Sequence, residues 1–441
     1  MPRLTRQAEA LRPAAERLVR AVVAACDPAR LVREHWPGDF DTSGQVTLVT
    51  AGKAAPAMAV AACECLGIAP VAGVGVIPPR VPGTERLAEL GIAALEADHP
   101  VPTGRNIEAA ARVVRVVESM PRDGTLLLLL SGGASAMLTL PAEGLSLEAL
   151  SKVTRALLRA GATIDELNTV RKHCERLKGG GLARLASPRT VRTLILSDVV
   201  GDRLDVIGSG PTAADPTTFA DALGVLERRN ALDASRAVTD RLRRGAAGEL
   251  PETLKPGDPL LARVRNEIVG SNDDALDAAA GFLRARGFRL ASVDRAVTGE
   301  AADVGRSLVC RLRAIPDAGR PACILIGGET TVTVGDATGV GGRNQELALA
   351  AAVELDGDPG LGVLAFATDG RDGPTDAAGA FVTGETVANA RERNLDLALA
   401  LREHDSHTAL EALGCLIRTG PTGTNVNDIV VGYALRTGPG V

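Results

Sequence analysis

Short apolar runs, each followed by a loop and a helical pattern, constrain the fold of this chain more than any other feature. In the first half, apolar runs at 46–50, 71–77, 125–130 and 193–196 alternate with helical patterns at 54–66, 107–118, 147–159 and 164–177. Strands and helices in rotation are typical of a doubly wound, mostly parallel sheet. We therefore predict an α/β protein whose N-terminal domain is Rossmann-like.

A charged stretch at 233–259, which contains three prolines, interrupts this pattern. Strand patterns then resume, and they are found at 267–270, 322–326, 330–334, 363–367 and 428–435. A length of 441 residues suits two domains. We expect an N-terminal domain over 1–240 and a smaller C-terminal α/β domain over 241–441. The close strand pair around Gly327 and Gly328 predicts a mixed sheet in the second domain.

Composition excludes several classes of protein. The net charge of −5 comes from evenly mixed signs, and aromatic residues make up only 2% of the chain, which disfavours nucleic-acid binding. The N-terminal segment lacks the apolar stretch of a signal peptide, and the run 126–130 is too short to span a membrane. The seven scattered cysteines indicate reduced thiols rather than a zinc site. We expect a soluble, cytoplasmic protein with no nucleic-acid or membrane partner.

The polar loop after the run 125–130 is the first candidate ligand site. It reads Ser131-Gly132-Gly133-Ala134-Ser135. Strand ends line the ligand crevice of a parallel sheet, and glycine lets backbone N–H groups approach an anion. We predict that this loop binds a phosphate or a carboxylate through Ser131, Gly132, Gly133 and Ser135. The alternative is a tight turn without a ligand.

Other polar groups follow in the same half. Arg171, Lys172 and Lys178 lie on a helix that ends in three glycines, where they reach toward a phosphate unless they form an ordinary solvated face. Asp198 follows a predicted strand, a position from which carboxylates hold Mg²⁺ or act as a base. Ser209 lies in the turn-rich loop beyond it. Only five of the 49 basic residues are lysines, and Lys53 is one of them, which favours a role that needs a compact ammonium group.

The second half carries its own polar loops. Arg343 and Asn344 open a predicted helix after a glycine turn, an arrangement that favours an anionic ligand. Asn425 lies in the last polar glycine loop. The row Asp369, Asp372 and Asp376 resembles a metal site but lacks the layout of an EF-hand, and Asp369 and Asp376 are candidate ligands.

Familiar nucleotide motifs are absent from the sequence. There is no G-x-x-x-x-G-K-[ST] loop, because Gly52-Lys53 is followed by Ala54. There is also no G-x-G-x-x-G that joins a first strand to a helix. A nucleotide must therefore bind by a less common route.

Segments along nearly the whole chain resemble the D-glycerate 2-kinases of the MOFRL family, also called class II glycerate kinases. The matching segments are AGKAAPAMA (51–59), HPVP (99–102), SGGASAML (131–138), NTVRKHCERLKGGGLA (168–183), the segment 197–223, GGETTVTV (327–334), GVGGRNQELAL (339–349), ATDGRDGPTDAAGA (367–380) and GPTGTNVNDIVVGY (420–433). The chain departs from the family pattern at Ala134, where a third glycine is usual, and at Thr103, where an acidic residue is usual.

The resemblance implies ATP-dependent phosphorylation of D-glycerate at its 2-hydroxyl, giving 2-phosphoglycerate, with Mg²⁺. Such a transfer needs anion binders and positioning, which two α/β domains would supply from opposite walls of a closing cleft. In this interpretation Lys53 and Arg343 stabilise the transferring phosphoryl group and the glycerate carboxylate. Asp198 is the general base or a Mg²⁺ ligand. The other metal candidates are Glu329, Asp369 and Asp376.

Two alternatives rank below the kinase. Some family members carry the label hydroxypyruvate reductase, but that NAD(P)H-dependent reaction would need the dinucleotide fingerprint that is absent. A non-catalytic sensor of sugar acids or sugar phosphates would use the anion loops but would not need the acidic residues of the second half. The partners are in any case small molecules, and the sequence is compatible with a homodimer.

Overall fold

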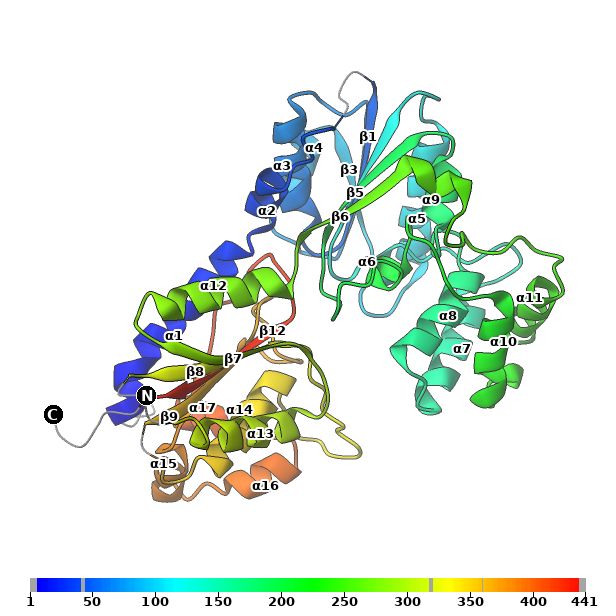
Figure 1. Ribbon diagram of the computed structural model, residues 1–441. Helices are drawn as coiled ribbons and strands as arrows, with labels where there is room; N and C mark the ends of the chain where they lie inside the picture. The colour runs from blue at the N-terminus through cyan, green and yellow to red at the C-terminus, as the bar shows by residue number, and fades with distance from the viewer. Residues whose placement is uncertain (1–5, 41–43, 317–319, 359, 436–441) are drawn as a thin grey trace. The chain divides into compact units, whose positions relative to one another are not determined.

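The computed structural model describes residues 6–40, 44–316, 320–358 and 360–435 (Figure 1). The chain divides into two compact units, each with its own sheet. We call residues 28–269 the N-terminal unit and residues 1–27 with 270–441 the C-terminal unit.

The sheet of the N-terminal unit has the strand order β3-β2-β1-β4-β5-β6. The pairings among its first five strands are all parallel. The strands are β1 Val46–Ala51, β2 Ala72–Ile77, β3 Ile92–Glu96, β4 Thr125–Leu130, β5 Thr190–Leu196 and β6 Val264–Gly270. Every residue of β1 and β4 is buried, as expected for strands that helices cover on both faces. The predicted doubly wound parallel sheet is confirmed.

The helices of this unit form two groups (Figure 1). Those packed on the sheet are α3 Ala55–Leu66, α4 Thr84–Glu89, α5 Gly104–Glu118, α6 Ala134–Met137 and α9 Gly181–Ala186, and α2 Pro28–Glu34 packs on α3. Beside the sheet, a separate apolar cluster joins α7 Leu147–Arg159, α8 Ile164–Cys174, α10 Phe219–Arg228 and α11 Arg236–Ala246. Short 3₁₀ turns are η1 Ile207–Ser209, η2 Leu232–Ala234 and η3 Pro259–Arg263.

Local capping explains where several of these helices begin. Thr103 and Asn106 form a reciprocal capping box at the start of α5, and Thr163 and Glu166 form another at the start of α8. The departure from the family pattern at Thr103 therefore has a structural use, because its hydroxyl caps a helix.

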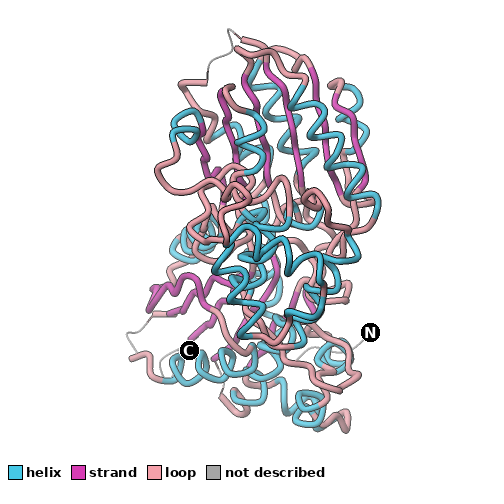
Figure 2. The backbone as a smooth tube through the Cα atoms, turned by 90° about the vertical axis from the view of Figure 1, so that its right-hand side faces the viewer, coloured by secondary structure: helices cyan, strands magenta, loops and turns pink. Residues whose placement is uncertain are grey.

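The sheet of the C-terminal unit is mixed, as predicted. Its order is β11-β10-β9-β12-β8-β7, with β7 and β8 parallel and the other pairs antiparallel. The strands are β7 Arg289–Val297, β8 Ala322–Gly328, β9 Leu361–Ala367, β10 Gly379–Thr383, β11 Leu416–Ile417 and β12 Asp428–Ala434. The alternation of helix and strand colours in Figure 2 shows the α/β character of the whole chain.

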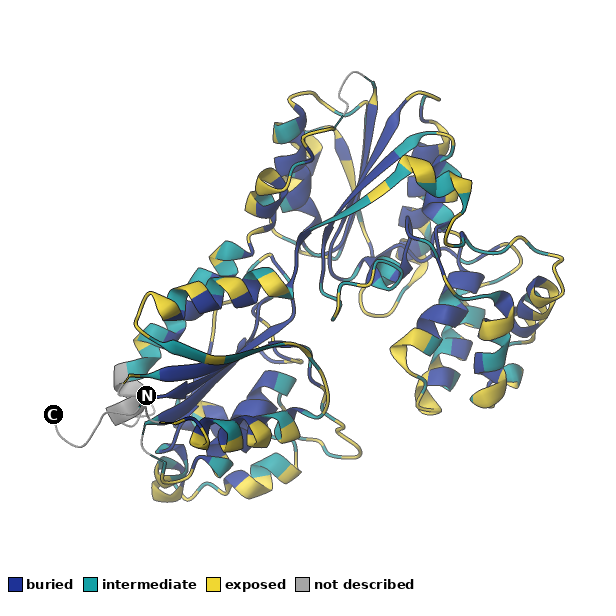
Figure 3. Cartoon of the chain, in the orientation of Figure 1, coloured by how far each residue is buried: buried dark blue, intermediate teal, exposed yellow. Residues whose placement is uncertain are grey.

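Helices cover both faces of this second sheet. One face is covered by α1 Arg6–Ala25 and α12 Asn272–Arg284 (Figure 1). The other face is covered by α13 Ala301–Arg313, α14 Arg343–Glu354, α15 Thr386–Glu392, α16 Leu397–Arg402 and α17 Ser406–Leu413. The inner strands and the inner helix faces are buried in both units, while the edge strands β3, β6 and β7 and the outer helix faces are more exposed (Figure 3).

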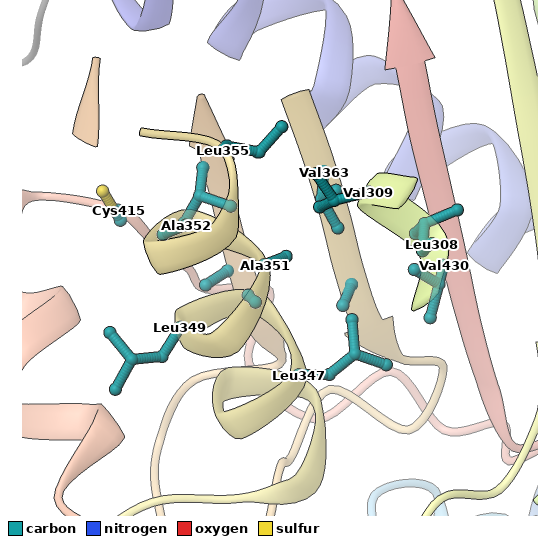
Figure 4. Close-up of a cluster of buried hydrophobic side chains, with 14 of the residues drawn as sticks. Leu308, Val309, Leu347, Leu349, Ala351, Ala352, Leu355, Val363, Cys415 and Val430 are labelled. Atoms are coloured by element: carbon teal, nitrogen blue, oxygen red, sulfur yellow. The ribbon is translucent and has the colours of Figure 1, made fainter. Parts of the chain in front are cut away.

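The central helix of the C-terminal core is α14. Figure 4 shows Leu347 on the side of β9, and Leu349 and Ala352 on the side of Cys415. Because apolar side chains leave α14 in both directions, most of the helix is enclosed by the core. The backbone at its first residues is consequently held in place, which matters for the polar groups there.

Three details differ from the sequence-based expectations. The units divide near residue 270 rather than at 240/241, because β6 pairs within the N-terminal sheet and α1 packs on α12 in the C-terminal unit. The stretch 233–259 contains helix α11, whose apolar face joins the helical cluster. The strand expected at 330–334 is only an isolated bridge between Thr331 and Glu300.

Candidate active site

Two loops that follow neighbouring strands of the N-terminal unit are locked together. The Ser131 hydroxyl accepts a hydrogen bond from the backbone N–H of Ala54 at 3.0 Å, and the Gly132 carbonyl accepts one from that of Lys53 at 2.9 Å. Gly52 has a φ of 123°, and a Cβ atom there would lie 2.3 Å from the Ser131 hydroxyl oxygen. This close approach places Lys53 beside the Ser131–Ser135 loop.

The conformation of this loop depends on Gly133 rather than on the residue after it. Gly133 has a φ of 90° and precedes α6, while Ala134 is already the first helical residue. Alanine at 134 is therefore compatible with the loop. A Cβ atom at Gly133 would meet Met137 at 2.7 Å and the His99 ring at 3.1 Å. Burial, together with the charge of Lys53, lowers the pKa of His99, so Lys53 and His99 both belong to this site.

Two of the predicted serines are in direct contact. The hydroxyls of Ser135 and Ser209 are 2.7 Å apart, and that of Ser209 donates to Asn168 Oδ1 at 3.1 Å. Ser209 has a φ of 62° and lies between two glycines that also have positive φ. The loop 208–210 is thus joined to the loop 131–135, although the two are far apart in the sequence.

Arg171 and Lys178 both donate to the Ser135 carbonyl, at 3.2 Å and 2.7 Å. They also pair with the two oxygens of Glu175, at 3.3 Å from Arg171 and 2.7 Å from Lys178. Burial, assisted by the charge of Arg171, lowers the pKa of Lys178 to about 7, although Glu175 opposes the shift. Both cations therefore support the Ser135 loop from behind, and Lys178 is buried.

A second buried lysine, Lys172, has an internal role instead of the contact with a phosphate that the sequence left open. Lys172 donates to Asp205 at 3.1 Å and to Asp215 at 3.2 Å, and Asp215 is fully buried. Asp215 also accepts hydrogen bonds from Thr217 and Thr253. This network connects α8 to the long loop 203–217. Lys172 is thus one of the few lysines of the chain, but its role is structural.

In the C-terminal unit, Arg343 is held by two carboxylates. Its Nε and one terminal nitrogen donate to the two oxygens of Asp428 at 2.5 Å and 3.0 Å, and the other terminal nitrogen pairs with Glu329 at 2.9 Å. Burial would lower the pKa of Arg343, but Asp428 and Glu329 outweigh it and raise that pKa. Burial raises the pKa of Asp428 against the opposing charge of Arg343. The two-oxygen contact indicates an ionised pair.

Asp372 fixes the first turn of α14, where Arg343 begins. Its oxygens accept from the backbone N–H groups of Asn344 at 3.1 Å and Gln345 at 2.8 Å. Burial and the neighbouring charge of Asp428 raise the pKa of Asp372 to about 6, although these N–H groups oppose the shift. Asn344 is buried and directs its side-chain amide to the same carboxylate, so it supports the turn, while its Oδ1 has no hydrogen-bond partner.

The predicted metal candidates are dispersed. Glu329 pairs with Arg343, and Asp376 is exposed and pairs with Arg418 at 3.1 Å. Asp369 accepts from the backbone N–H of Arg371, and Asp198 is half-buried after β5. Within the described ranges, no three His, Cys, Asp or Glu side chains gather closely enough to hold a metal ion. A Mg²⁺ bound mainly by nucleotide phosphates needs only one or two carboxylates, and the single carboxylate of Asp198 suits that.

The remaining predicted residue, Asn425, lies half-buried in the loop before β12 and accepts from the backbone N–H of Asn427. The loop 420–427 precedes Asp428, the partner of Arg343. Sequence reasoning did not identify Asp428, Glu175, Asp205 or Asp215 as parts of the polar networks. Asp428 could have been identified from the sequence, because it is a carboxylate at the first residue of an otherwise apolar strand.

Family models match both parts of the chain. A domain of unknown function, DUF4147, matches residues 14–243, and the MOFRL family matches residues 322–428. D-glycerate 2-kinase from Thermotoga maritima is 40% identical over 96% of this chain and 98% of that protein. Glycerate 2-kinase from Pyrococcus horikoshii is 39% identical over 94% of this chain and 95% of that protein.

A solved structure agrees with these relatives. The crystal structure of glycerate kinase from Thermotoga maritima matches with a TM-score of 0.85 and 39% identity, over 97% of this chain and all of that one. The architecture is thus that of an α/β phosphotransferase. The chain belongs to the MOFRL family, as its sequence motifs predicted.

Proposed function

We propose that this protein is an ATP-dependent kinase that phosphorylates D-glycerate at its 2-hydroxyl and releases 2-phosphoglycerate. Relatives at 39–40% identity over nearly the whole chain are glycerate kinases, and this supports phosphorylation of glycerate with ATP as co-substrate. Among the contacts in the structure, those that hold the guanidinium of Arg343 in place give the strongest support for this proposal. It is a fixed cation at the start of a helix, which is what a transferring phosphoryl group requires.

The contacts of Arg343 define what it can still bind. A guanidinium has five N–H donors. Asp428 takes two of them and Glu329 takes one, so two remain for an incoming anion. Glu329 is the more exposed of the two carboxylates, at 42% against 5%. Glu329 is therefore the partner that a phosphoryl or carboxylate oxygen would replace, while Asp428 keeps the guanidinium in position.

Lys53 supplies the second cation in this proposal. Its backbone is fixed by Gly132, so its compact ammonium group is presented beside the Ser131–Ser135 loop. Ser135 and Ser209 shape that loop, and Arg171 and Lys178 support it from behind. We assign Lys53 and Arg343 to stabilisation of the charge that develops on the phosphoryl oxygens.

Asp198 remains the candidate for the general base or for a Mg²⁺ ligand. As a base, its carboxylate accepts the proton of the glycerate 2-hydroxyl, whose oxygen forms a bond to the γ-phosphorus while the bond from that phosphorus to the leaving ADP breaks. Mg²⁺, when bound with the nucleotide, would neutralise charge on the phosphate oxygens, and Asp198 is the residue suited to hold it, with Asp369 as a further candidate. Glu329 and Asp376 are engaged in ion pairs.

We infer a cytoplasmic location for the protein, and the state of its cysteines supports this inference. All seven cysteines lie in the described part of the chain, and none of them forms a disulfide bond there, which suits a reducing compartment such as the cytoplasm. None of the described helices has the length and apolar character that a membrane crossing requires.

A coupled assay tests the proposal. The protein is incubated with D-glycerate, ATP and Mg²⁺, and the product is then offered to enolase alone or to phosphoglycerate mutase with enolase. Conversion by enolase alone identifies 2-phosphoglycerate, whereas a requirement for the mutase identifies the 3-phosphate. Arg343→Ala should lower turnover by about 10²–10³-fold. The control Arg391→Ala, which removes a surface pair with Asp356, should leave turnover unchanged.

The same preparation is mixed with hydroxypyruvate and NADH or NADPH. Oxidation of either cofactor at a rate comparable to kinase turnover would contradict the proposal and favour the reductase.

A further inference from the structure

The N-terminal unit contains a cavity of about 940 Å³ beside the cluster of helices α7, α8, α10 and α11. Its wall includes the loop 140–145, the end of α8, the start of α9, and single side chains of α10 and α11. Lys53, Ser131 and Asp198 are not among its lining residues. Volumes of this order hold small organic ligands.

The cavity wall combines apolar and basic groups. Apolar side chains include those of Leu140, Leu177, Leu250 and the ring of Phe219. The five basic lining residues are Lys172, Arg176, Lys178, Arg184 and Arg241, whereas the acidic ones are Glu143 and Glu175. The wall therefore suits a ligand that has both a carbon skeleton and a negative charge.

Two of the basic groups are neutralised within the protein. Lys172 is paired with Asp205 and Asp215, and Lys178 with Glu175. The three arginines differ from these lysines, because none of them forms an ion pair with any residue in the described ranges. With Glu143 as the one acidic lining residue outside these pairs, the cavity keeps a net charge of about two positive units.

Arg241 is the most buried of the three arginines, and it forms no ion pair with any described residue. Its Nε donates to the His173 carbonyl at 2.9 Å, and its guanidinium carbon lies 5.8 Å from the centre of the Phe219 ring. Burial lowers the pKa of Arg241, although the nearby charge of Glu143 opposes the shift, as expected for a cation that is partly removed from water and not closely paired with a carboxylate. Among the described residues, Arg184 donates to the Glu252 carbonyl alone, and both Arg176 and Arg184 are exposed. Arg241, which is partly desolvated, therefore gains free energy from an anion, and the exposed Arg176 and Arg184 add further N–H donors at the same wall.

We propose that this cavity binds an organic phosphate monoester through Arg176, Arg184 and Arg241. The charge of a phosphate monoester near neutral pH is about −1.5 to −2, which matches the uncompensated arginines. Planar guanidinium groups are suited to phosphate oxygens, and the leucines and Phe219 provide contacts for the carbon skeleton. Lys178 lines the cavity and also donates to the Ser135 carbonyl, so the bound ester lies one side chain away from the Ser131–Ser135 loop.

The test uses the full chain and glycerol 3-phosphate, a phosphate monoester that lacks the carboxylate of glycerate. Binding is measured by titration calorimetry at constant ionic strength, with inorganic phosphate and D-glycerate in parallel titrations. We expect one saturable site for glycerol 3-phosphate that is tighter than the site for inorganic phosphate. The double variant Arg176→Ala/Arg184→Ala should weaken it by at least about tenfold.

The matched control is Arg236→Ala, which removes an arginine from the same helix as Arg241 but outside the cavity wall. It should bind like the unmodified chain. If the double variant does not fold, the single variant Arg176→Ala is titrated instead. It should fold normally, because the Arg176 side chain forms no hydrogen bond or ion pair with any described residue. Absence of saturable binding up to about 10 mM, equal affinity for inorganic phosphate, or binding that survives these substitutions would each overturn the proposal.

Discussion

The pair between Arg343 and Asp428 offers the most direct test of how the C-terminal site is built. Asp428→Asn keeps the size of the side chain but removes its charge. At about 3 Å and an effective dielectric constant near 20, two unit charges attract by about 5 kcal/mol. Burial of Asp428 offsets part of this, and Arg343 keeps 31% exposure and its contact with Glu329. We expect the C-terminal unit to lose about 2–3 kcal/mol of unfolding free energy.

The chain provides one optical probe for each unit. Trp36 is the only tryptophan and lies in the N-terminal unit, whereas Tyr433, the only tyrosine, lies on β12 in the C-terminal unit. Urea unfolding is followed by Trp36 fluorescence and by the second-derivative absorbance of Tyr433. The Tyr433 transition of Asp428→Asn should move to lower urea concentration.

Turnover provides a second measurement. Because Asp428 holds the guanidinium of Arg343 in place, the substitution should lower turnover by roughly tenfold through loss of positioning. The matched control Asp356→Asn breaks a surface pair with Arg391 and should cost less than about 0.5 kcal/mol. If Asp428→Asn unfolds like the control and keeps full turnover, the idea that Asp428 anchors Arg343 is refuted.

Three further predictions address other parts of the molecule. Lys53→Arg should reduce turnover by about tenfold, or about 1.4 kcal/mol of barrier, with little change in Tm, and near-normal turnover would remove Lys53 from the mechanism. The pKa of Asp372 is raised to about 6, so folding favours the protonated form of this side chain. The stability that Asp372 contributes is therefore present below about pH 4 and is lost as the pH rises through 6. The loss in unfolding free energy is at most about 3 kcal/mol. Tyr433-detected urea unfolding between pH 4 and 7 should show this slope, and Asp372→Asn should lack it. Gly52→Ala should destabilise the N-terminal unit by about 2–4 kcal/mol in Trp36-detected unfolding, because its Cβ would meet Ser131. Gly67→Ala, at a positive φ with open space, should cost only about 1 kcal/mol, and equal losses would contradict the steric argument.

Local sequence patterns were sufficient to predict the architecture. Apolar runs such as 125–130 are buried strands because only a sheet covered on both faces removes so many aliphatic side chains from water. The loops after those strands were predictable for the same reason, since a parallel sheet brings its strand ends to one edge. The predicted closure of a cleft around the substrates, and the roles of Lys53, Asp198 and Arg343 in it, stay predictions.

Contacts between residues far apart in the sequence determine the features that the sequence patterns did not predict. Strand β6 and helix α1 were assigned to the wrong unit, because an apolar pattern shows that a segment is buried but not which sheet it joins. The partners of charged residues were equally hidden from the sequence: Lys172 meets Asp215 across 43 positions and Arg343 meets Asp428 across 85. A lysine in a glycine-rich segment looks the same whether it faces a ligand or a buried carboxylate. Only the folded chain, which sets the distance and the exposure of each charge, separates the two.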